Sequence, residues 1–191
     1  MRMVIDGLVR LHDAVFGGLQ MLLADWFLGL TARLVFGSVL LIYFWHSATL
    51  KVISGEPTGL LDYLTVEENA LFQMAPKAIE AAGYDPSALG GEYWLMAYAG
   101  TYAEFVLPLL VLIGLFTRLA SLGMIGFILV QSWVDVTGHD ADESTIGSVF
   151  DRIPDSALLD QRLLWIFPLL YLIVRGAGLI SVDALLRSTR G

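Results

Sequence analysis

Four long apolar stretches dominate the pattern of hydrophobic and polar positions along the chain. A helix needs about 20 mostly apolar residues to cross the hydrocarbon core of a bilayer, with a range of about 17 to 25. The first two stretches meet this length easily, and the last two meet it when they include a few flanking residues. We therefore predict four membrane-spanning helices, over about 28–53, 93–116, 117–135 and 160–180.

The N-terminal residues 1–24 follow a different pattern. Apolar side chains recur there at steps of three and four residues, at Val4, Leu8, Leu11, Val15, Leu19 and Leu22. This is the period of an amphipathic helix, and charged residues interrupt every window in which a cleavable signal peptide would be apolar. We expect a helix that lies in the membrane interface. A helix packed on a partner subunit is an equal alternative.

The polar segments between the stretches differ in length. Two long loops cover residues 54–92 and 135–162, whereas the second and third stretches are joined by only a few residues around Gly114. The short link predicts a tight antiparallel helical hairpin. In the first loop, Thr65 and Glu68 have the spacing of a capping box, which predicts a short helix after them.

Composition narrows the class of protein. Of the 191 residues, 57% are hydrophobic and 16% charged, whereas a soluble domain has about 45–50% and about 25%. This composition excludes an ordinary soluble enzyme and a disordered chain. The net charge of −8 excludes a nucleic-acid partner, because phosphate backbones attract basic proteins. There is no Cys, which excludes disulfides, thiolate metal sites and covalent haem attachment.

The distribution of charge predicts the orientation. Of the 11 Lys and Arg residues, 7 lie in the N-terminal segment, the short hairpin turn or the C-terminal tail, whereas 14 of the 19 acidic residues lie in the two long loops. By the positive-inside rule, both termini should be cytoplasmic. The predicted fold is all-α: a single domain over 1–191, forming a four-helix bundle in a membrane, with an N-terminal interfacial helix and two long periplasmic loops.

Glu104 is the strongest candidate for a functional residue. It lies near the middle of the second predicted span, where a charged side chain costs at least about 2.5–3.5 kcal/mol to insert. His46 lies in the outer half of the first span. Six further polar or aromatic residues are expected at a similar depth: Tyr98, Tyr102, Gln131, Asp135, Arg162 and Trp165.

These residues predict a polar pocket that opens to the outer side and binds a quinone head group or relays protons. The alternative is a hydrogen-bonded network, or an ion pair between Glu104 and an Arg, that only fixes the packing of the helices. Arg33, Arg118 and Arg175 are expected to anchor the chain at the inner interface, with their charged ends extended toward the head groups.

No metal site is expected in this chain. The acidic stretch over residues 135–143 lacks the ligand spacing of a calcium loop. Three scattered His residues and the lack of Cys argue against copper or zinc held by this chain alone. No covalent cofactor is expected, and a quinone is the candidate ligand.

The order and spacing of the polar positions resemble those of the DoxX family of small four-helix inner-membrane proteins. The matching pieces are Arg33, Gly37, Trp45-His46 and Lys51 in the first span, Tyr102-Ala103-Glu104-Phe105 in the second, the turn Gly114–Ala120, and the exit Gly176–Leu186. The resemblance implies a membrane subunit. The family's namesakes are subunits of a thiosulfate:quinone oxidoreductase and of an associated terminal quinol oxidase, and other members work in redox-stress complexes.

Together these observations predict a DoxX-like subunit of a redox or quinone-linked system in the inner membrane. It is expected to be an oxidoreductase subunit that is not catalytic alone. Its acidic outer loops would dock a protein partner, in a homo- or hetero-oligomer within the lipid bilayer. The alternatives are a non-catalytic assembly or scaffold subunit of a membrane complex, and an accessory protein in a copper response pathway.

Overall fold

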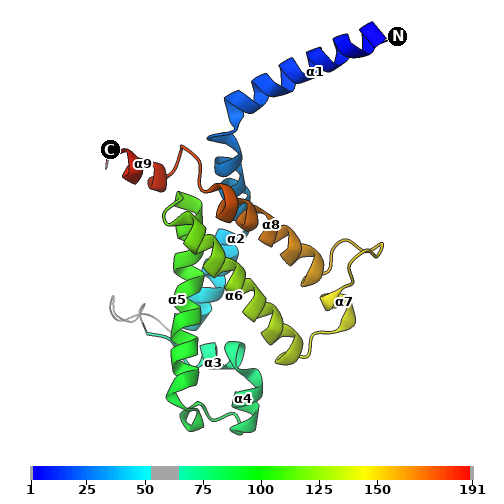
Figure 1. Ribbon diagram of the computed structural model, residues 1–191. Helices are drawn as coiled ribbons and strands as arrows, with labels where there is room; N and C mark the ends of the chain where they lie inside the picture. Colours follow the sequence, from blue (N-terminus) through cyan, green and yellow to red (C-terminus); the bar gives the residue numbers. More distant parts are fainter. Residues whose placement is uncertain (1, 53–64, 190–191) are drawn as a thin grey trace.

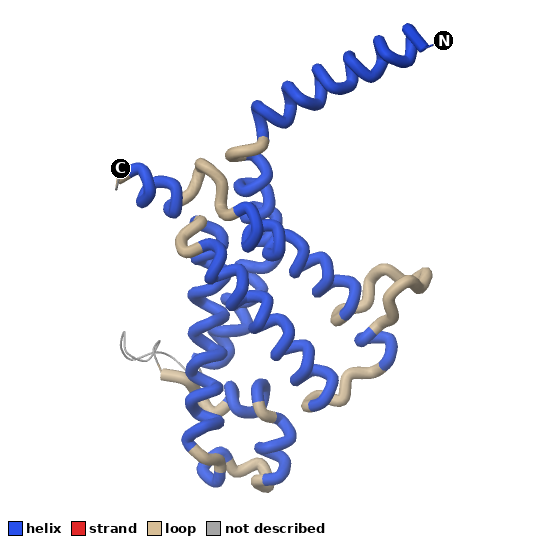
Figure 2. Tube along the Cα trace, in the orientation of Figure 1, coloured by secondary structure: helices blue, strands red, loops and turns tan. Residues whose placement is uncertain are grey.

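The chain folds into helices joined by turns and loops (Figure 1, Figure 2). The computed structural model describes residues 2–52 and 65–189, apart from the side chain of Met3, and contains no strand within those ranges. Its elements are α1 (Arg2–Leu23), α2 (Phe27–Val52), α3 (Asn69–Met74), α4 (Pro76–Ala81), the 3-10 helix η2 (Pro86–Ala88), α5 (Gly91–Ile113), α6 (Thr117–Thr137), α7 (Glu143–Ile146), α8 (Leu159–Arg175) and α9 (Val182–Ser188).

Three of the described helices, α2, α5 and α6, are long and apolar enough to cross a membrane. The span expected over 160–180 corresponds to α8, which has 17 residues and ends at Arg175. It ends there because Gly176 adopts a positive φ of 82°, which few residues other than Gly tolerate. At 1.5 Å per residue α8 is about 25 Å long, shorter than the hydrocarbon core of about 30 Å.

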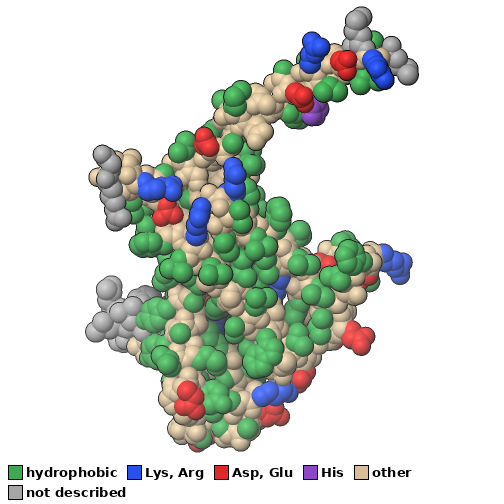
Figure 3. Space-filling view, in the orientation of Figure 1, with side chains coloured by type: hydrophobic (Ala, Val, Ile, Leu, Met, Phe, Trp, Pro, Cys, Tyr) green, Lys and Arg blue, Asp and Glu red, His purple; other side chains and the backbone are tan. Residues whose placement is uncertain are grey.

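The four helices α2, α5, α6 and α8 enclose an apolar core. α2 and α6 each pack against both α5 and α8. The side chains buried between them come from all four helices: Phe36, Leu40, Phe44, Val111, Ala120, Met124, Ile128, Leu169 and Leu172. On the face drawn in Figure 3, hydrophobic side chains cover the middle of the molecule and charged ones gather toward its ends. This distribution suits a protein surrounded by lipid.

The molecule has two distinct ends, which we call the terminal end and the loop end. The terminal end holds the α5–α6 turn, α9 and the junction of α1 with α2, and the loop end holds α3, α4 and α7 (Figure 1). α1 extends away from the other helices with its apolar side chains exposed. It is the helix expected over 1–24, and its placement in the membrane interface stays a prediction.

Asp183 of α9 fastens the hairpin turn at the terminal end. Its carboxylate accepts hydrogen bonds from the Thr117 backbone N–H at 2.9 Å, the Thr117 hydroxyl at 2.7 Å and the Phe116 N–H at 2.8 Å. The first N–H groups of a helix have no partner within the helix, so this carboxylate caps α6. Burial raises the pKa of Asp183, but these hydrogen bonds outweigh burial and hold the pKa below its usual range.

Arg33 differs from its expected role as an interface anchor. It is buried with an exposed fraction of 3%. Its guanidinium donates to the carbonyl of Leu112, at 2.9 Å, and to that of Ile180. The end of α5 and the chain before α9 thus supply the acceptors that head groups were expected to provide. Arg118 and Arg175 are exposed at the terminal end, and their role as interface anchors stays a prediction.

The short helix expected after Thr65 is α3, but it starts three residues later than a capping box would place it. Its N-cap is Glu68, whose side chain makes no capping hydrogen bond. The preceding segment lies against the end of α2, where the N–H of Glu67 donates to the carbonyl of Lys51 at 2.7 Å. The chain is therefore tied to α2 just before α3 begins. The start of the loop expected over 54–92, up to residue 64, lies outside the described residues.

Candidate functional site

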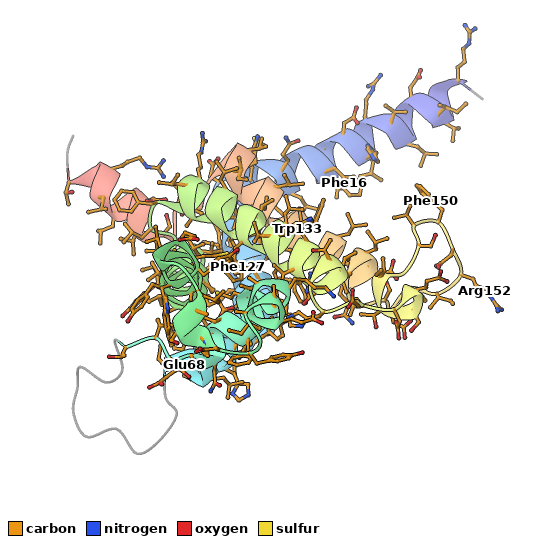
Figure 4. The ribbon with its side chains drawn as sticks, turned by 90° about the horizontal axis from the view of Figure 1, so that it is seen from below. Phe16, Glu68, Phe127, Trp133, Phe150 and Arg152 are labelled. Atoms are coloured by element: carbon orange, nitrogen blue, oxygen red, sulfur yellow. The ribbon has the colours of Figure 1, made fainter. Side chains whose placement is uncertain are left out.

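A cavity of about 440 Å³ lies between α5 and α6 in the half of the molecule toward the loop end. Its walls are mostly apolar or small, and they include Met96, Ala99 and Ala103 of α5 and Gly123, Gly126, Phe127 and Val130 of α6. Figure 4 shows Phe127 on the side of α6 that faces the interior, whereas Trp133 points outward. A Cβ placed on Gly126 would meet no atom within 4 Å, so this glycine borders open space.

A buried ion pair forms the polar part of the cavity wall. The Lys51 ammonium, from the last turn of α2, lies 2.7 Å and 2.9 Å from the two carboxylate oxygens of Glu104 on α5. The side chains of Lys51 and Glu104 are only 2% and 5% exposed. The Ser47 hydroxyl accepts from the ammonium at 2.8 Å and donates to the carboxylate at 3.3 Å. The charges are therefore paired and hydrogen-bonded, as burial requires.

The backbone of α5 next to Glu104 is also tied to α2. Pro108 lies four residues after Glu104 and has no N–H, so the Glu104 carbonyl lacks its helical donor. The indole N–H of Trp45 donates to the next carbonyl, that of Phe105, at 3.0 Å. Trp45 and Lys51 thus hold α2 against α5 at Phe105 and Glu104.

A second polar cluster joins α6 to α8 beside the cavity. The guanidinium of Arg162 donates to the carboxylate of Asp135 at 2.5 Å and to the hydroxyl of Ser132 at 2.6 Å. It also lies 5.9 Å from the ring centre of Trp165, within the range of a cation–π contact. Asp135 lines the cavity, whereas Arg162 does not. Arg162 therefore acts on the cavity only by holding Asp135.

Gln131 also lines the cavity, and its amide donates to the Tyr43 hydroxyl at 3.2 Å. Its carbonyl oxygen is buried and accepts no hydrogen bond from any residue that the structure describes. An unpaired buried acceptor is costly, and a ligand that donates a hydrogen bond would remove the cost.

The structure brings together some of the residues expected in the polar pocket and leaves out others. Glu104, Gln131 and Asp135 line the cavity. His46 is exposed on α2 and is not part of the cavity wall. Tyr98 and Tyr102 stack on each other with ring centres 6.4 Å apart, also away from the wall.

The two long loops meet over the loop end of the cavity. His139, after α6, forms a hydrogen bond with the carbonyl of Gln73 at 3.0 Å, and both residues line the cavity. Beside them the Lys77 ammonium lies 2.7 Å from the Asp140 carboxylate, and this hydrogen bond raises the pKa of Lys77. The loops therefore form one surface at this end of the molecule.

Sequence reasoning did not identify Lys51 as the partner of Glu104, although the structure makes it a candidate functional residue. Successive helical residues are separated by about 100° around the axis, so Lys51 is about 40° from Ser47 but about 140° from His46. Long side chains on a helix lean toward its N-terminus, which directs Lys51 from the loop end back into the protein. These two rules place Lys51 on the Ser47 face of α2, but only the structure shows that this face meets Glu104. The residues that the structure describes include no group of three or more His, Asp or Glu that could hold a metal ion.

Comparison with known proteins identifies the family. The DoxX family model matches residues 28–137, more than half of the chain, and this match covers α2 through α6. The cavity residues on α2, α5 and α6 lie within it, whereas the exit segment Gly176–Leu186 lies beyond it. No curated protein and no solved structure matches the chain. On this family match and its membrane-length apolar helices, the chain belongs to the DoxX family of membrane proteins.

Proposed function

We propose that this chain is a membrane subunit of a redox or quinone-linked system, and that it holds a quinone head group in the cavity between α5 and α6. The observation that carries this proposal is a mostly apolar cavity of about 440 Å³ with a buried Lys51–Glu104 pair in its wall. Small-molecule sites commonly combine apolar walls with a few convergent polar groups.

The cavity suits a ligand that dissolves in the membrane. Exposed residues of both spanning helices border it, including Met96 and Ala99 of α5 and Val130 of α6. A bilayer around these helices would place lipid against this opening, so a hydrophobic tail could remain in lipid while a polar head enters.

The polar groups suit both redox states of a quinone. The Lys51 ammonium can donate to a quinone carbonyl oxygen, and Glu104 or the free Gln131 carbonyl oxygen can accept from a quinol hydroxyl. Reduction of a quinone to a quinol takes two electrons and two protons. The chain offers no electron carrier of its own, so a partner subunit supplies or removes the electrons.

The topology that accompanies this function has four spans with cytoplasmic termini in the bacterial inner membrane. α8 completes the set because it packs against α2 and α6, and flanking residues extend it to the interfaces. A reporter that is active only in the periplasm should stay silent when fused after Gly191. Activity of that fusion would overturn this orientation.

Filling the cavity tests quinone binding directly. Gly126→Leu places an isobutyl group in space where a Cβ meets no atom within 4 Å. We expect this variant to bind a decyl-substituted benzoquinone at least about tenfold more weakly than the unmodified chain, measured by calorimetric titration in detergent. The matched control is Leu164→Phe, which adds bulk on an exposed face of α8, a helix that contributes no residue to the cavity wall.

Equal binding by Gly126→Leu and the unmodified chain would refute the quinone site. So would an equal loss in both variants, because the effect would then not arise from the cavity. Circular dichroism and melting temperature should be unchanged in both variants, which separates loss of the site from loss of the fold.

A scaffold role is the second candidate, favoured by the loop after α7. Phe150 and Arg152 lie at the tip of this loop and point away from the helices (Figure 4). Phe150 is fully exposed and Val149 and Ile153 are about half exposed. Large aromatic side chains are common anchors of protein–protein interfaces, and Phe150 projects from its loop as such an anchor would. Under this hypothesis Phe150→Ser releases a copurifying chain in mild detergent, whereas Gly126→Leu retains it.

A further inference from the structure

A second cavity, of about 300 Å³, lies at the terminal end, on the opposite side of the molecule from the proposed quinone site. We call it the basic notch. The end of α8, the first turn of α6 and the junction between α1 and α2 form it. Its polar side chains are Asp25, Arg118, Tyr171 and Arg175, and its floor includes Gly176 and Gly178.

The two arginines of the basic notch lack carboxylate partners. No carboxylate of the described residues lies within 4 Å of either guanidinium. Among the described residues, the Arg118 guanidinium donates only to the main-chain carbonyl of Val174, at a long 3.3 Å, and Arg175 makes no hydrogen bond. Most of the donors on these side chains are therefore free to bind an anion. Among the described residues, Asp25 is the only acidic one that lines the notch, so the lining side chains carry one net positive charge.

The backbone keeps the basic notch open. Gly176 and Gly178 have φ values of 82° and 81°, which disfavour any residue with a side chain. A Cβ at Gly176 would lie 3.7 Å from Nε of Arg118, in the space in front of the guanidinium. The N–H of Leu179 donates to the carbonyl of Asp25 at 2.9 Å, which ties the floor to the α1–α2 junction.

The position of the basic notch decides which anion is available to it. α2 starts at Phe27 and α6 at Thr117, so the notch lies where two spanning helices begin. This is the level of lipid head groups in a bilayer. Basic pockets between membrane helices bind anionic lipid head groups, and a guanidinium can form two parallel hydrogen bonds with a phosphate.

We propose that the basic notch binds the phosphate group of an anionic phospholipid. Arg118 and Arg175 contact the phosphate oxygens, and the Tyr171 hydroxyl provides a further donor. The acyl chains lie along the apolar surface of α8, where Leu170 and Val174 are exposed. A lipid in this position would link α6 to α8 and the α1–α2 junction.

The test measures lipid retention by native mass spectrometry of the full chain, stripped of lipid and then titrated with phosphatidylglycerol or phosphatidylcholine. We expect preferential retention of phosphatidylglycerol. The double variant Arg118→Gln/Arg175→Gln should bind it about 25-fold more weakly, from about fivefold for each cation. The control Arg2→Gln/Arg10→Gln removes the same charge from α1 and should change binding by less than about threefold.

Three outcomes would overturn the proposal. The first is an equal loss in the control pair, which would show nonspecific attraction to the terminal end. The second is equal retention of the two lipids. The third is full displacement of the lipid by millimolar inorganic phosphate, which would make the notch a site for free phosphate.

Asp25→Asn gives an independent readout that a purely structural role would not produce. It removes the only carboxylate from the notch, so phosphatidylglycerol should bind several-fold more tightly, and unchanged or weaker binding would contradict the proposed contact. Quinone binding should be unaffected in all of these variants, because the two cavities share no lining residue.

Discussion

Replacing one member of the buried Lys51–Glu104 ion pair is expected to destabilise the protein more than replacing both. Glu104→Leu leaves the Lys51 ammonium without its carboxylate, and Lys51→Met leaves the carboxylate without its ammonium. Each group is at least 95% buried and its partner lies within 2.9 Å, so water cannot replace the lost charge. The double variant leaves two apolar side chains in contact.

The size of the effect follows from this burial. Removing one member of a buried pair costs about 3–5 kcal/mol, because the remaining charge stays desolvated and unpaired. Replacing both members by apolar side chains of similar volume is often neutral or stabilising. The double variant should therefore have a free energy of unfolding at least about 2 kcal/mol above that of either single variant.

The unmodified chain, the two single variants and the double variant form a double-mutant cycle. Their free energies of unfolding can be measured in mixed micelles with a rising fraction of sodium dodecyl sulfate, followed by circular dichroism. The exposed Lys77–Asp140 pair is the matched control, since its side chains are 53% and 74% exposed. Its cycle should show no measurable coupling.

Additive costs in the Lys51–Glu104 cycle would refute the reasoning. Additive costs would mean that Lys51 and Glu104 do not interact in the folded protein, so the pair would not form the polar part of the cavity wall. A stable Glu104→Leu variant would contradict the buried pair in the same way.

Two further perturbations test the terminal end. Asp183→Ala should lower the free energy of unfolding by about 1–2 kcal/mol through loss of the α6 cap. Since the folded pKa of Asp183 is depressed, the stabilisation by this cap is present above the unfolded pKa and is lost as the pH falls through the folded pKa. The melting temperatures of the variant and the unmodified chain should therefore converge in acid. A constant difference down to pH 2 would contradict this. Gly29→Ala should lower the free energy of unfolding by about 1–3 kcal/mol, because its Cβ would lie 2.6 Å from the carbonyl oxygen of Ala177. The control is Gly17→Ala, where a Cβ meets no atom within 4 Å. Equal melting temperatures of the two variants would contradict the close contact at Gly29.

The candidate site could be predicted only in part. Glu104 was identifiable because a lone acid in a long apolar stretch is costly and needs a partner. The identity of the partner depends on how α2 is rotated about its axis relative to α5, which apolar periodicity does not fix. Of residues 46 and 51 on α2, only Lys51 contacts Glu104, whereas His46 is exposed.

The sequence by itself determined the membrane class, the apolar stretches, the tight hairpin and the family. These properties depend on local composition and spacing, because a bilayer forces an apolar stretch of sufficient length to be helical. Only the tertiary structure decided that Lys51 pairs with Glu104, that Arg33 is buried, and that glycines on α6 border a cavity. Each of these requires side chains distant in sequence to meet, and packing between helices sets their rotation and separation.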